Sequence, residues 1–135
     1  MIHKLAIYPV TLFIYKGLDH KQYKKQVLKD SNGLASQKFI DATSTDDFRA
    51  IVHSYHGNVV IRFIEKKPSV GLVAHEALHA TCRIMDYVGV KMCEDSEEAW
   101  AYLLQEIINE INYEKPKPKP KTKTSNSSTR RPRRR

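Results

Sequence analysis

The chain has 135 residues, of which 41% are hydrophobic and 28% charged, enough for one domain. Its formal net charge of +8 is concentrated at one end, because residues 115–135 hold ten Lys and Arg residues and no acid. Removing these ten from the 23 basic residues leaves 13, against 15 acidic residues, so residues 1–114 carry a net charge of −2. We therefore predict a folded domain over 1–114 and a disordered basic tail over 115–135, which excludes a strongly basic nucleic-acid-binding body.

The cysteine content and the N-terminal apolar run limit the cellular setting. Cys82 and Cys93 are too few for a disulfide scaffold and lack the C-x-x-C spacing of a thiolate zinc site. We expect two reduced, mostly buried thiols in a cytoplasmic protein. The apolar run over residues 5–15 is too short to cross a bilayer and has no cleavage site after it. We interpret it as a β-strand and expect no membrane partner.

The first half of the chain predicts both strands and a polar helix. Residues 4–17 are rich in β-branched and aromatic side chains, and Pro9 places this strand at a sheet edge or breaks it. Residues 19–30 are typical of a polar surface helix that ends at the Ser-Asn-Gly sequence following them. The segment 37–42 is interpreted as a short strand.

The segment 44–58 has two interpretations. Its apolar residues follow helical spacing and a capping-box pattern precedes them, which favours a helix. The alternative is a β-hairpin that turns at the His-Gly-Asn sequence 56–58. Residues 59–65, of sequence VVIRFIE, predict a strand under either interpretation.

Two long helices are predicted in the second half. Ser69 can cap a helix that runs to about Val88, and Gly89 can end it. A second helix begins with Asp95 or Ser96 as its cap and carries acidic residues in its first turn.

The first of these helices contains an HExxH sequence formed by His75, Glu76 and His79. Residues four apart lie on one helix face, so both imidazoles can reach a single Zn²⁺ ion at about 2.0–2.1 Å. Glu76 can take a proton from a zinc-bound water, the chemistry that makes this pattern a metalloprotease signature. The alternative is a surface helix with two solvated histidines.

The sequence after His79 decides among ligand patterns. A third histidine of the HExxHxxGxxH type is excluded, because Met85 occupies its position. The HEALHA sequence followed by SEEAWAYL, within residues 58–112, resembles the small zincin-like metallopeptidases predicted in phages and prophages. The resemblance implies His75 and His79 as metal ligands, Glu76 as general base and Glu98 of the E-x-x-A-Y pattern as third ligand. The apolar stripe of the second helix points nearer to Glu97, which therefore stays an alternative.

Other polar residues near the motif have weaker claims. Tyr102 lies one turn beyond Glu98 and is a candidate for binding an oxyanion, or is a core tyrosine. Cys82 and Asp86 continue the histidine face and can orient an imidazole, although packing is the commoner role of such a cysteine. The remaining candidates are two histidines of the preceding segment, His53 and His56.

The resulting prediction is an α+β, zincin-like domain with a small mixed sheet packed on the HExxH helix and the glutamate-ligand helix. Its predicted function is zinc-dependent hydrolysis of protein or peptide substrates, in the host cytoplasm if a phage encodes it. One alternative is a non-catalytic, metal-stabilised phage or nucleic-acid-associated protein tethered by residues 115–135, and another is a metal-dependent hydrolase with non-peptide substrates. Nucleic-acid or other polyanion binding by this tail would be sequence-independent and salt-sensitive, and the alternative role of the tail is solubility.

Overall fold

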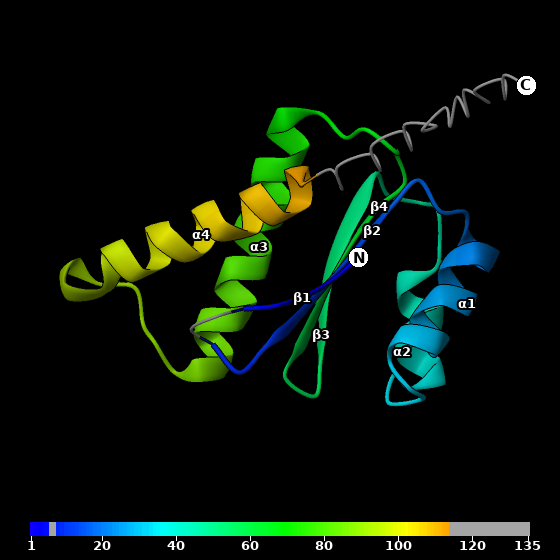
Figure 1. Cartoon of the computed structure of the whole chain (residues 1–135), viewed down its shortest axis with the longest axis horizontal. Coiled ribbons are helices and arrows are strands. Elements are labelled where there is room, and N and C mark those ends of the chain that lie inside the picture. Colours follow the sequence, from blue (N-terminus) through cyan, green and yellow to red (C-terminus); the bar gives the residue numbers. More distant parts are fainter. Residues whose placement is uncertain (6–7, 114–135) are drawn as a thin grey trace, which may run out of the picture.

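The computed structural model describes residues 1–5 and 8–113, which form an α+β fold around one four-stranded mixed sheet (Figure 1). The strand order is β1-β2-β4-β3, with β2 and β4 parallel and the two outer pairs antiparallel. The elements, in chain order, are β1 (Ile2–Lys4), β2 (Thr11–Lys16), α1 (His20–Asp30), α2 (Gln37–Thr43), β3 (Ala50–Tyr55), β4 (Asn58–Phe63), α3 (Val70–Val88), a 3₁₀ turn (Glu94–Ser96) and α4 (Glu97–Asn112).

Helices cover both faces of the sheet, with α3 and α4 on one side and α1 and α2 on the other (Figure 1). Side chains of a strand alternate between the faces. In β2, Leu12 and Ile14 pack toward α3 and α4, whereas Phe13 and Tyr15 pack toward α1 and α2. Because both faces are covered, the central strands are buried almost throughout, and α3 packs on one of these faces.

The N-terminal segment is interrupted as Pro9 indicated, but its main strand is not at an edge. β1 and β2 are separate strands on either side of the Pro9 segment, and β2 lies in the interior of the sheet between β1 and β4. Pro9 itself is outside both strands, so its missing N–H group removes no bond from the sheet.

Two secondary-structure predictions are wrong. The segment predicted as a strand at 37–42 is the helix α2, because Ser36 caps it by accepting a hydrogen bond from the Phe39 N–H group. The segment 44–58 is not helical but forms β3 and the turn of a hairpin with β4, as the alternative stated. The turn residues His56 and Gly57 both have positive φ, of 44° and 74°, as a two-residue type I′ hairpin turn requires.

The predicted bounds of the HExxH helix are confirmed. The Ser69 hydroxyl accepts a hydrogen bond from the Leu72 N–H group at 3.3 Å and starts α3. Gly89 ends it in the left-handed conformation, at a φ of 75°, with the following Val90 N–H group bonded to the Met85 carbonyl at 2.9 Å. These two caps fix the length of the helix that carries the histidines.

The second long helix starts where the sequence indicated, after Ser96, and the 3₁₀ turn precedes it.

Cys82 and Cys93 are both free thiols and both exposed, so the expectation of buried thiols is wrong. Within the described ranges, no helix has the length and apolar character needed to span a membrane. The predicted tail, residues 115–135, lies outside the described residues.

Candidate metal and catalytic site

The buried face of α3 explains how the HExxH residues are oriented. Its inward side packs small and apolar residues against the sheet and α4, listed along the helix as Val73, Ala77, Ala80, Ile84 and Met85. His75 and His79 lie off this face and are exposed, whereas Glu76 is 6% exposed. The helical spacing therefore separates two outward imidazoles from one inward carboxyl, as the sequence predicts.

The two imidazoles converge. The Nε2 atoms of His75 and His79 are 3.1 Å apart, and the ring planes make an angle of 77°. Two nitrogen ligands at about 2.0–2.1 Å from one zinc ion lie about 3.1–3.4 Å apart when the angle at the metal is about 100–110°. The pair therefore has the spacing of two ligands of one metal ion. In the metal-free protein the same distance allows a hydrogen bond, in which one imidazole donates.

Glu76 shares a hollow of about 270 Å³ with these histidines. Burial raises the pKa of the Glu76 carboxyl above its ordinary value, and the nearby charges of His75 and His79 oppose the rise. A carboxyl with a raised pKa beside two metal-type ligands suits a group that first accepts and then returns a proton. The remaining residues around this hollow are Ala50, Ile51 and Val52 of β3, with Arg83 of α3.

Glu98 is not in this hollow. It is exposed and lines a different hollow of about 310 Å³, on the side of α3 that presents Leu78. Glu97 lines the same second hollow, and the two hollows have no residue in common. Among residues 1–5 and 8–113, no three His, Cys, Asp or Glu side chains are grouped so that they could hold a metal ion. The described residues thus bring two candidate donors, His75 and His79, together, and the third ligand stays a prediction.

The secondary candidates are distributed around the molecule. Tyr102 is 66% exposed and belongs to neither of these hollows. Asp86 lines another hollow beside Trp100, and Cys82 lines none of those described here. His56 occupies the hairpin turn and lines a further hollow, which shares Arg83 with the hollow of the histidine pair.

His53 is linked to the histidine hollow by the charge of Arg83, which lines that hollow. Its ring packs edge-on against Phe39 at a centroid distance of 5.9 Å. Burial, followed by the positive charge of Arg83, lowers the pKa of His53 and favours the neutral imidazole. His53 thus packs on α2, and its pKa is affected by Arg83, which lines the hollow of the histidine pair.

The sequence analysis missed that β3 and Arg83 line the hollow of the histidine pair. Arg83 follows His79 by four residues and so continues the face of both histidines, a signal that the sequence does contain. The contribution of β3 has no such signal, because the apolar spacing of the segment 44–58 favours a helix and only the hairpin alternative makes it a strand. The comparisons with known proteins found no matching family model, no matching curated sequence and no matching solved structure.

Proposed function

We propose that this protein is a zinc-dependent peptidase in which His75 and His79 hold the metal and Glu76 is the general base. The observation that carries the proposal is the 3.1 Å separation of the two Nε2 atoms beside a nearly buried glutamate in one hollow. A zinc ion, when bound, lowers the pKa of a coordinated water and polarises a carbonyl group. Glu76 accepts the proton of the attacking water at its carboxylate and delivers it to the leaving amine.

The edge of β3 supports a peptide as the substrate. β3 ends the sheet in the described part of the chain, and its residues 50–52 line the histidine hollow. The Ile64 N–H group bonds to the Arg49 carbonyl, and Tyr55 pairs with Asn58 across the two-residue turn. In an antiparallel pair the backbone groups of alternate residues point away from the partner strand. Those of Ala50, Val52 and Ser54 therefore point outward, where an extended peptide can pair with them.

The zincin-like character of the fold belongs to this proposal too. Support comes from a mixed sheet whose edge strand β3 lies beside the HExxH helix, and from α4, which packs on α3. Glu98 remains the proposed third ligand because of its place in the E-x-x-A-Y pattern. For Glu98 to join the histidines, the start of α4 has to move around α3 from its present hollow.

The experiment that tests the proposal changes one atom of the general base. Glu76→Gln keeps the size of the side chain but cannot accept the proton, so zinc content and circular dichroism should match the wild type while peptide turnover is lost. A digest of a peptide library by the wild type, with a zinc-chelated sample as control, provides the turnover assay. Equal turnover by the Glu76→Gln variant would remove Glu76 from the mechanism.

The charge partition favours a second candidate function, binding to a polyanion through the tail. Residues 115–135 carry ten of the 23 basic residues, and the rest of the chain has a net charge of −2. Deletion of 115–135 should abolish most affinity for DNA, and the full chain's affinity should fall steeply with salt without depending on base sequence. Unchanged DNA binding after the deletion would place the contact on the folded domain instead, where α1 carries four lysines, Lys21, Lys24, Lys25 and Lys29.

A further inference from the structure

The histidine hollow is the middle part of a longer groove between β3 and α3. A hollow of about 400 Å³ adjoins it toward Arg49 and shares Ala50, His75 and Glu76 with it. A hollow of about 230 Å³ adjoins it toward the hairpin turn and shares Arg83 with it. The groove thus follows β3 from Ala50 to Tyr55, with His53 as the one strand residue outside its lining, and Arg83 lines both its second and its third part.

The two arginines at this groove differ in how they are paired. Arg49 donates to the Glu65 carboxylate through both Nε and Nη2, at 3.1 and 2.7 Å. Arg83 is exposed, and within the described residues it has neither an ion pair nor a hydrogen bond. Its positive charge acts on the His53 imidazole. A guanidinium carries five donors in a planar fork that matches a carboxylate. Arg83 therefore presents an unmatched positive charge to whatever occupies the groove.

The position of Arg83 along the groove sets which part of a ligand it meets. Arg83 lies four positions after His79 on the helix, which is about 6 Å along the axis at 1.5 Å per residue. An extended peptide on the β3 edge advances about 3.3 Å per residue, so this offset corresponds to about two peptide residues. A carboxylate two residues from the bond beside the histidines is thus within reach of the guanidinium.

We propose that Arg83 is a specificity residue, which selects extended peptides that carry an acidic side chain about two residues from the cleaved bond. This inference rests on the proposed peptidase function and adds the chemical class of its substrate. Arg83 positions the substrate by a forked, charge-assisted contact with the carboxylate, while the outward backbone groups of β3 hold the peptide chain.

The activity test uses the full-length protein and three peptides that differ at one position, with Glu, Gln or Lys two residues from the cleaved bond, made for either side of that bond. The wild type should cleave the Glu peptide with a kcat/KM about tenfold above that of the Gln peptide. Arg83→Gln should abolish this preference, and Arg83→Glu should turn it toward the Lys peptide. The matched control is Lys25→Gln, the same loss of charge on α1, where the preference should persist.

A binding test separates failure of this inference from failure of the peptidase function. Fluorescence anisotropy of the labelled peptides is measured with Glu76→Gln and with Glu76→Gln/Arg83→Gln, and tail attraction is the same in both. Tighter binding of the Glu peptide that depends on Arg83, without wild-type cleavage, supports Arg83 as the residue that selects acidic peptides and refutes the peptidase function. Cleavage with equal rates for all three peptides refutes the inference and leaves the peptidase standing. Absence of both cleavage and an Arg83-dependent preference refutes both.

Discussion

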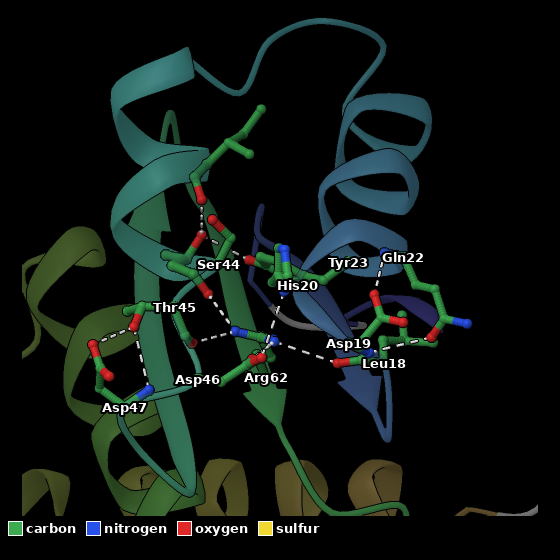
Figure 2. Close-up of polar contacts among 12 residues, drawn as sticks. Leu18, Asp19, His20, Gln22, Tyr23, Ser44, Thr45, Asp46, Asp47 and Arg62 are labelled. Atoms are coloured by element: carbon green, nitrogen blue, oxygen red, sulfur yellow. Dashed lines mark hydrogen bonds and ion pairs between the residues drawn. The ribbon is translucent and has the colours of Figure 1, made fainter.

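Replacement of Arg62 by Met should strongly destabilise the protein, because this arginine is a completely buried charge on β4. Figure 2 shows the polar contacts of its guanidinium. Its Nη1 atom donates to the carbonyl oxygens of Thr43 and Thr45, at 3.0 and 2.6 Å. Its Nη2 atom donates to the Leu18 carbonyl at 3.3 Å and to the Asp46 carboxylate at 2.5 Å. The guanidinium therefore joins the connection between β2 and α1, the end of α2 and the loop that leads into β3.

The magnitude follows from these acceptors. Arg62→Met leaves three carbonyl groups without this donor, and the contact with Thr43 is the fully buried one. An unsatisfied buried acceptor costs about 1–3 kcal/mol, and water can reach the two partly buried carbonyls at lower cost. Met regains packing and removes a desolvated charge, which offsets part of the loss. We expect a net loss of about 3 kcal/mol, a large part of the typical 5–15 kcal/mol of a folded domain.

Urea unfolding followed by circular dichroism measures this loss, with Asp46→Asn as the control. The Asp46 side chain is 47% exposed and its amide can still accept from Arg62, so this variant should lose at most about 1 kcal/mol. Arg62→Lys should fall between the two, since one ammonium group cannot span both branches of the network. If the free energy of unfolding of Arg62→Met is within about 1 kcal/mol of the wild-type value, the hydrogen bonds of Arg62 do not stabilise the loop before β3.

Two further predictions concern the metal and alkaline pH. His75→Ala and His79→Ala should each abolish zinc retention, as measured by metal analysis after dialysis. In the same assay Glu98→Ala should weaken zinc binding strongly and Glu97→Ala only slightly. The reverse order for the two glutamates would favour Glu97, the alternative indicated by the apolar stripe. Burial raises the pKa of Tyr23 to about 12, so between pH 10 and about 12 the unfolded chain has lost this proton while the folded protein keeps it. The contribution of Tyr23 to the free energy of unfolding then falls by roughly 1.4 kcal/mol per pH unit. Urea unfolding at pH 9–11 should show a shallower fall for Tyr23→Phe, and an identical slope would refute the assignment.

The HExxH helix was the most predictable part of the molecule because its signals are local. Ser69 and Gly89 lie directly at its ends, and the histidines are spaced by a single turn, so no distant contact is needed to place them. Glu98 shows the limit of this reasoning. Its place within α4 was predictable, but its position around α3 depends on how two helices pack, which spacing along the chain does not determine.

Arg62 illustrates why the layers were not predicted. The sequence VVIRFIE indicated a strand, yet the sequence alone gave no reason to bury its arginine, which is 0% exposed. Burial becomes favourable only because α1 and α2 cover that face of the sheet and present the acceptors around the guanidinium. This second helical layer was not predicted, because the polar sequence of α1 indicates a surface helix and the segment 37–42 was interpreted as a strand.

β3 is the mispredicted segment that lines the histidine hollow. An edge strand of a sheet covered on both faces is partly buried on either side, so its residues show no clear alternation of polar and apolar side chains. Val52 packs toward α3 and Tyr55 toward α2, and their spacing with Ile51 happens to match a helix. The feature that we propose for peptide docking is the backbone edge of β3, which pairs with no further strand among residues 1–5 and 8–113. This edge belongs to no side chain and therefore leaves no mark in the sequence.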